Sequence, residues 1–273
     1  MPPMAERPLA GKVVLVTRPE PRDGPLMAAL AARGAEPLSA PAIRIEPSKS
    51  QAFARAIRDA AEGRFIWVVF TSPATVAAWS EKAGEIGVDS AALRSRVAAV
   101  GSGTRSALLR WGIEPELVPS TFTTAALGRA FPRGEGEVLM PRADVAPLEL
   151  EEAVRRKGWT PVRVEAYRTR PVRSLPAEAR SAMRSGRVDA VTFTSASTVD
   201  GFLKVAEIPE GARIVCIGPV TSRAVRQRGL RVDAVARPHT AEGLVEAVER
   251  ALRSRTRASR SARVRASTRR EAR

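Results

Sequence analysis

The stretch VTFTSASTVDGF, residues 191–202, nearly repeats VVFTSPATVAAW, residues 68–79. In both stretches a hydrophobic run ends on Phe-Thr-Ser, and an apolar pattern with helical spacing follows. A short, continuously apolar strand that is followed at once by a helix is typical of parallel sheets with both faces covered. The repetition therefore predicts two copies of one α/β unit within the chain.

The similarity between the two copies extends beyond the opening pair. Residues 98–118 match residues 215–235 in the order strand, glycine, two-residue gap, threonine, helix, glycine, strand. Residues 14–34 match residues 138–158 in the same way. Two doubly wound units are therefore expected to make up residues 10–250. The expected strands are residues 12–18, 65–71, 96–101, 138–141, 188–193, 214–218 and 232–236.

Length and composition indicate an ordinary two-domain globular protein. The chain has 273 residues, of which 44% are hydrophobic and 27% charged, and no apolar run reaches the length of a membrane span. Its first residues lack the apolar stretch of a signal peptide, so a cytoplasmic location is expected. Because Cys216 is the only cysteine, no internal disulfide can form.

The net charge of +16 is concentrated at the end of the chain. Residues 251–273 contain nine Arg and one Glu, which gives +8 and leaves 16 − 8 = +8 for the rest. This stretch has little to bury, so we expect it to be a disordered Arg-rich tail. A nucleic-acid-associated role that acts through the tail stays open. The remaining positive charge suits a protein that binds small polyanions. A generally arginine-rich composition would produce the same excess of charge.

The repeated motifs place small polar residues where strands end and helices begin. Parallel α/β sheets bind ligands at this edge, because helix N-termini present free N–H groups and partial positive charge there. The alternative for each Ser or Thr alone is a simple helix cap. The candidate substrate-binding residues at these ends are Thr71, Ser72, Gly101, Ser102, Thr104, Thr194, Ser195, Ser197, Gly218 and Thr221.

Other site types are disfavoured by the residues present. The loop at 101–106 begins like a dinucleotide-binding loop, but Ser106 stands at its third glycine position. With one His and one Cys, the chain offers neither a zinc site nor a Ser-His-Asp triad. We expect Cys216 to be a buried small hydrophobe, and His239 to belong to the cap region of a helix that starts at Thr240. No metal and no other cofactor is expected.

Two arginines follow matching strands of the two copies. Arg18 stands in TRP and Arg142 in PRAD. The guanidinium fork suits carboxylate binding, so both are candidate substrate-binding residues, although a solvated surface side chain is the default in so Arg-rich a chain.

Taken together and in order, the short motifs resemble the uroporphyrinogen-III synthase family over about 240 residues. The motifs are VTRP (16–19), FTSPATV (70–76), AVGSGT (99–104), VEAYRTRP (164–171), FTSASTV (193–199) and CIGPVTSRAV (216–225). Where relatives often carry an Asn in the first FTS loop, this chain has Ala74 and Thr75.

The resemblance implies two similar flavodoxin-like domains that are joined by a two-stranded β connection. It implies that they hold the linear tetrapyrrole hydroxymethylbilane between them and close it, with loss of water and inversion of the last ring, as a cofactor-free monomer. The implied division is residues 1–40 plus 170–250, residues 41–169, and the tail 251–273. A bilobed protein that only binds an anion stays open as an alternative.

Tyr167 is the only tyrosine. By similarity it aligns with a tyrosine that the family keeps at the cleft, and this resemblance makes it the candidate catalytic residue. A phenol is a neutral proton donor at pH 7 and could protonate the departing hydroxyl group. The alternative from the residues alone is a packed aromatic side chain on a connecting strand.

Overall fold

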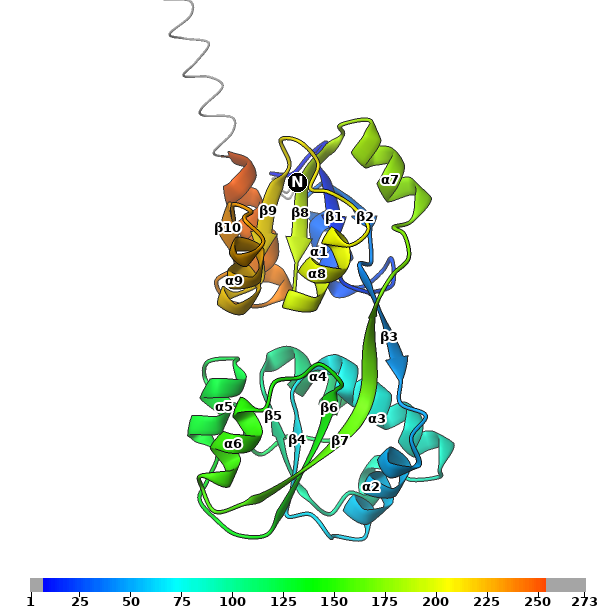
Figure 1. The fold of residues 1–273 in the computed structure, drawn as a ribbon, viewed down its shortest axis with the longest axis vertical. Coiled ribbons are helices and arrows are strands. Elements are labelled where there is room, and N and C mark those ends of the chain that lie inside the picture. The colour runs from blue at the N-terminus through cyan, green and yellow to red at the C-terminus, as the bar shows by residue number, and fades with distance from the viewer. Residues whose placement is uncertain (1–6, 254–273) are drawn as a thin grey trace, which may run out of the picture. The chain divides into compact units, whose positions relative to one another are not determined.

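The computed structural model describes residues 7–253, which form two compact units. One unit is residues 45–169, and the other consists of the described residues before and after it. Each unit has a five-stranded sheet with helices around it (Figure 1). None of the helices between residues 7 and 253 is long and apolar enough to cross a bilayer.

In the first unit, residues 7–44 and 170–253, the strands pair in the order β10-β9-β8-β1-β2, and each pairing is parallel. The central strands are apolar at nearly every position, so they are buried from both sides. The strands are β1 (Val13–Val16), β2 (Glu36–Ser39), β8 (Val188–Phe193), β9 (Arg213–Cys216) and β10 (Ala234–Val235).

Helices cover both faces of this sheet because the strand side chains alternate. Val13 and Leu15 pack with α7 (Ala177–Arg184), α8 (Ala196–Leu203) and α9 (Pro219–Gln227). Val14 and Val16 pack with α1 (Pro25–Ala32) and with the C-terminal helix, residues 241–253.

The second unit, residues 45–169, has the strand order β3-β7-β6-β4-β5. Its core contains α2, α3 and α4 on one face of the sheet, and α5 and α6 on the other. Its elements are β3 (Ile43–Pro47), α2 (Gln51–Ala61), β4 (Trp67–Phe70), α3 (Pro73–Glu85), the 3₁₀ turn Ser90–Ala92, β5 (Arg96–Ala99), α4 (Ser102–Arg110), α5 (Thr124–Ala130), β6 (Glu137–Ala143), α6 (Glu149–Arg155) and β7 (Thr160–Pro171).

The two sheets are copies of one arrangement, which confirms the predicted fold class. In spatial order, β9-β8-β1-β2 of the first unit corresponds to β5-β4-β6-β7 of the second. Each sheet carries three helices on one face and two on the other. The corresponding strands occur in a different order along the sequence. In the second unit β4 and β5 precede β6 and β7, whereas in the first unit the corresponding β8 and β9 follow β1 and β2.

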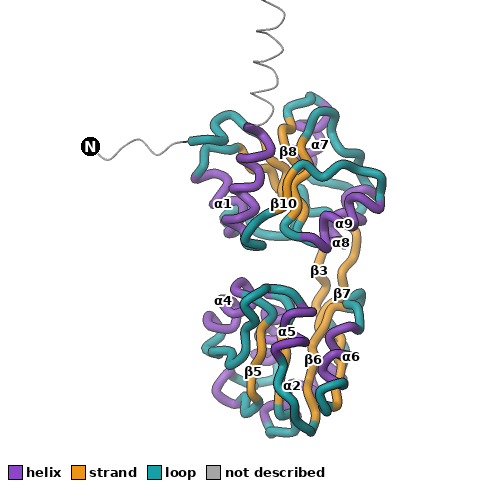
Figure 2. The backbone as a smooth tube through the Cα atoms, turned by 90° about the vertical axis from the view of Figure 1, so that its left-hand side faces the viewer, coloured by secondary structure: helices purple, strands orange, loops and turns teal. Residues whose placement is uncertain are grey.

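The adjacent strands β3 and β7 are the two segments in which the chain passes from one unit to the other (Figure 2). They correspond to the expected two-stranded β connection. We propose that the units are the two expected domains, residues 1–40 with 170–250, and residues 41–169.

Residues 251–253, which we expected to belong to the Arg-rich tail, are helical. Ala251 and Leu252 are helical and only 4% and 6% exposed, because they extend the apolar stripe that contains Leu244 and Val248. Residues 251–253 therefore belong to the folded unit. The rest of the expected tail lies outside the described residues.

Cys216 should be unreactive in the folded protein. Its side chain is fully buried on β9, and burial raises the pKa of the thiol to about 12. Thiol reagents attack the thiolate, so we expect a disulfide reagent at pH 8 to label Cys216 only after unfolding by denaturant. Rapid labelling of native protein would contradict this placement.

Candidate active site

In the second unit, Ser72 is the N-cap residue of α3 and lies two residues after the end of strand β4. Ser72 Oγ accepts a hydrogen bond from the Thr75 N–H at 3.1 Å, and Pro73 occupies the first helical position. The Ser72 and Thr75 hydroxyl oxygens are also 2.9 Å apart. The cap interpretation of Ser72 is thus confirmed, and the same hydroxyl is in position to contact a further group.

That further group is the phenol of Tyr167. Its hydroxyl oxygen lies 3.2 Å from Ser72 Oγ, although the two residues are 95 positions apart in the sequence. Tyr167, Ser72 and Thr75 form a row of hydroxyl groups at the N-terminus of α3. The partial positive charge of a helix N-terminus favours negative charge that develops on an oxygen here.

A β-bulge turns Tyr167 toward α3. The register of β6 and β7 pairs Arg142 with Glu165 but Ala143 with Tyr167, so Ala166 is the extra residue. Without the bulge, Tyr167 would point away from the face that Val164 and Ala166 share, because strand side chains alternate. Instead all three pack in the core beneath α2, α3 and α4.

The next helix along this edge, α4, has Gly101 as its N-cap residue. A Cβ atom at Gly101 would lie 2.8 Å from Cβ of Phe122, so only glycine fits beneath this aromatic side chain. Thr104 is buried in the first turn, and Ser102 is half-buried. Phe122 remains 37% exposed beside these residues.

The first unit repeats this arrangement at the matching strand ends. Ser195 caps α8 by accepting from the Thr198 N–H at 3.2 Å, and its hydroxyl oxygen is 2.9 Å from that of Ser197. Thr194 is half-buried beside them. Ser195 and Ser197, both candidate substrate-binding residues, therefore lie close together.

Gly218 and Thr221 occupy the same positions in α9 as Gly101 and Thr104 in α4. A Cβ at Gly218 would lie 3.2 Å from Nδ1 of His239, so His239 takes the place that Phe122 has in the other copy. The cap of the C-terminal helix is Thr240, which accepts from the Gly243 N–H at 3.1 Å.

The two candidate arginines differ in their surroundings. Arg18 is partly exposed, and its Nε lies 3.2 Å from the carboxylate of Glu20. Arg142 is only 2% exposed, and its Nη1 lies 3.5 Å from Glu151, whereas we expected either a substrate carboxylate or solvent around it. Burial lowers the pKa of Arg142, and Glu151 opposes that shift.

Sequence reasoning missed Phe122, Asp144, Glu151 and Arg163. Glu151 carried a usable signal, because it lies on the apolar side of α6 with Leu150 and Val154. A carboxylate in such a stripe indicates a buried cationic partner. Nothing in the local sequence around the other three distinguishes them from surface residues.

The site therefore offers backbone amides, hydroxyl groups and one phenol. Within residues 7–253 there is no group of three His, Cys, Asp or Glu side chains that could hold a metal ion. Such a set can bind carboxylates and donate a proton to an oxygen leaving group.

Comparisons with known proteins identify the family of the chain. Residues 25–246 match the model of the family uroporphyrinogen-III synthase HemD. The chain belongs to the uroporphyrinogen-III synthase family. It is 30% identical to uroporphyrinogen-III synthase of Synechococcus elongatus, over 93% of this chain and all of the relative. It is also 30% identical to a putative uroporphyrinogen-III synthase of Methanothermobacter thermautotrophicus, over 79% of this chain and 89% of that one.

A solved structure shares the fold. A mutant uroporphyrinogen III synthase from the extremely thermophilic bacterium Thermus thermophilus superimposes with a TM-score of 0.62 at 22% identity, covering 89% of this chain and 99% of that one. Family membership places the chain in tetrapyrrole biosynthesis as a ring-closing lyase.

Replacing Ser72 by Ala should cost about 1 kcal/mol of stability, because α3 loses its cap. Urea unfolding measures this difference. Ser80→Ala is the matched control, since Ser80 lies within the same helix and its hydroxyl donates only to the Ala77 carbonyl among the described residues. Equal stabilities of the two variants would contradict the capping role.

Proposed function

We propose that this chain is a uroporphyrinogen-III synthase that converts hydroxymethylbilane into uroporphyrinogen III, and that Tyr167 is its catalytic residue. The observation that carries the proposal is the contact of the Tyr167 phenol with Ser72 at the N-terminus of α3. It combines a proton donor, a helix end that favours anions, and motifs of the family in one place.

In the proposed reaction, Tyr167 donates its proton to the hydroxymethyl oxygen, and water leaves. The remaining azafulvenium cation is an electrophile, and the substituted carbon of the terminal pyrrole attacks it to form a spiro intermediate. Rearrangement then inverts this ring, and a ring carbon loses a proton, which balances the one that Tyr167 supplied. Pyrroles are intrinsically nucleophilic, so the protein mainly has to fix which carbon attacks.

The substrate has eight carboxylates, which amides, hydroxyls and one arginine can bind through charge-assisted hydrogen bonds. Arg142 is left out of this set because Glu151 already neutralises it in the interior. The proposed substrate-binding residues are Thr71, Ser72, Gly101, Ser102 and Thr104 in the second unit, and Arg18, Thr194, Ser195, Ser197, Gly218 and Thr221 in the first.

We also propose that the protein acts as a monomer in the cytoplasm, and that residues 254–273 are dispensable for catalysis. Light scattering should give a mass near the 29.3 kDa of one chain.

Removal of residues 254–273 should abolish retention on DNA without lowering synthase activity. Loss of activity would contradict this part of the proposal.

Genetic complementation tests the proposed function. Expression of the chain in a bacterium that lacks its own uroporphyrinogen-III synthase should restore haem-dependent growth. A protein that only binds the bilane would not restore growth, and that result, with folded protein present in the cells, would overturn the proposal.

A further inference from the structure

We propose that Asp144 is a positioning residue for Tyr167, and that Arg163 and Glu151 hold the loop that carries Asp144. The proposal rests on the function proposed above for Tyr167. It concerns the last residue of β6 together with the segment that connects β6 to α6, residues 143–148, which we call the clamp loop.

Asp144 contacts the backbone of Tyr167 and of Thr169, the second residue after it. Its N–H donates to the Tyr167 carbonyl at 3.1 Å, and its carboxylate accepts from the Thr169 N–H at 3.0 Å. These two bonds fix the backbone positions of Tyr167 and Thr169. The backbone that carries the phenol is thereby held at two points.

The bulge explains why such a clamp is needed. The extra residue Ala166 interrupts the regular pairing of β7 with β6 immediately before Tyr167. The Ala166 carbonyl is bound instead by the Ser48 N–H at 2.9 Å. Asp144 then supplies, from a loop, the partners that an uninterrupted ladder would have given to Tyr167 and Thr169.

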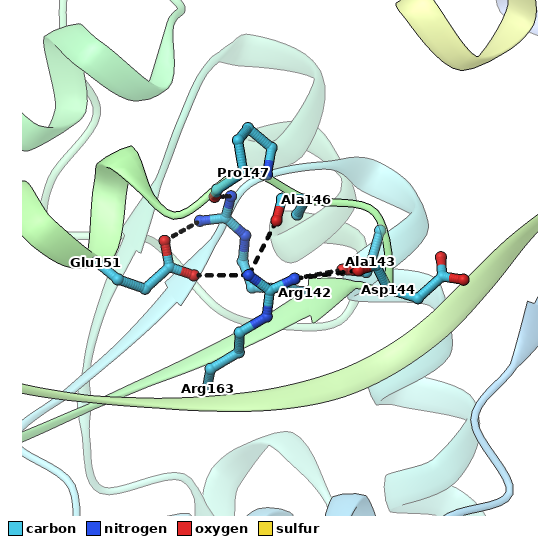
Figure 3. A network of polar contacts seen from close by, with 7 residues as sticks. All are labelled: Arg142, Ala143, Asp144, Ala146, Pro147, Glu151 and Arg163. Carbon is cyan, nitrogen blue, oxygen red and sulfur yellow. Dashed lines mark hydrogen bonds and ion pairs between the residues drawn. The ribbon is translucent and has the colours of Figure 1, made fainter. Parts of the chain in front are cut away.

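The clamp loop is held by polar contacts more than by burial. Val145 and Leu148 are 63% and 56% exposed, so they contribute little to fixing it. Arg163 donates to the carbonyl groups of Ala143, Asp144 and Ala146 at 3.0, 3.3 and 2.9 Å. One guanidinium group thus binds three carbonyl groups of the loop backbone (Figure 3).

Glu151 keeps Arg163 in that position. Its carboxylate lies 3.6 Å from Arg163 Nη1 and 3.5 Å from Arg142 Nη1, so it lies between the two arginines (Figure 3). Arg142 Nη2 donates to the Pro147 carbonyl at 3.1 Å, which fixes the far end of the loop. Residues that orient a catalytic group in this way raise the rate of the reaction without contacting the substrate.

Because Tyr167 is the only tyrosine, a label on tyrosine reports on it alone. Protein with ¹³C at only the ζ carbon of tyrosine should give one sharp signal in the wild type. In Asp144→Ala the signal should move and broaden, while Asp144→Asn, which keeps the accepting oxygen, should restore it. Glu152→Ala is the control, because Glu152 is an exposed acid of α6.

The same variants should also differ from the wild type in their steady-state kinetics. We expect Asp144→Ala to lower kcat about tenfold or more with KM within about twofold, because the phenol is misplaced while the substrate ligands remain. In the background of Tyr167→Phe, the Asp144→Ala change should have almost no further effect on kcat. Fully additive losses, or a tenfold loss with an unchanged tyrosine signal, would overturn the proposal.

Arg163→Gln provides a second route if Asp144→Ala does not fold. It leaves Asp144 in place but removes the three carbonyl contacts, and it should broaden the tyrosine signal in the same way. A wild-type signal in folded Arg163→Gln would overturn the role of Arg163. The tyrosine signal is measured without substrate, so it tests the clamp even if the proposed function fails.

Discussion

Replacing Tyr167 by Phe should slow formation of the inverted isomer by about 10²- to 10⁴-fold, which corresponds to roughly 3–5 kcal/mol of transition-state stabilisation. The change removes one hydroxyl group, which lies 3.2 Å from Ser72 Oγ, and keeps the aromatic ring in the core. Substrate binding should change little, so the loss should appear in kcat. Steady-state rates with freshly prepared hydroxymethylbilane measure it.

The control for this variant is its stability. Tyr167 is 9% exposed and packs beside Val164 and Ala166, and phenylalanine fills the same space. The melting temperature should therefore stay close to that of the wild type. Unchanged turnover in a folded Tyr167→Phe protein would remove Tyr167 from the mechanism.

Replacing Glu151 by Gln should lower the free energy of unfolding by about 3 kcal/mol. Arg142 is 2% exposed, and the loss of the Glu151 charge leaves its guanidinium buried without a counter-ion. Arg163 loses the carboxylate at 3.6 Å as well. Urea unfolding of the variant measures the change.

Two further variants make this prediction specific. Glu152→Gln alters an exposed neighbour on the same helix and should change stability by less than about 0.5 kcal/mol. The double variant Arg142→Met with Glu151→Leu removes both buried charges and should regain most of the stability that Glu151→Gln loses. Wild-type stability of Glu151→Gln would show that the buried pair contributes nothing.

The sequence predicted the features that depend on local pattern. Continuous apolar runs such as Trp67–Phe70 became central strands, and Ser72 and Ser195 became helix caps. The internal repeat also predicted which strands correspond, because each motif recurs at the same place in a sheet. These features follow from residue type and spacing alone.

What the sequence did not predict depends on contacts between distant segments. The bulge at Ala166 changes the face on which Tyr167 lies, and nothing in VEAYRTRP distinguishes it from a regular strand. Arg142 looked like a surface residue because its partner Glu151 comes from the next helix. Ala251 and Leu252 were likewise assigned to the tail because of the Arg-rich composition that follows them, although both pack in the core.

The isomer composition of the product tests the central claim most directly. With purified protein in excess over hydroxymethylbilane, a single turnover followed by chromatography should give mainly the inverted isomer, faster than the bilane closes alone. Formation of the uninverted isomer, in the same proportion and at the same rate as without protein, would contradict the account.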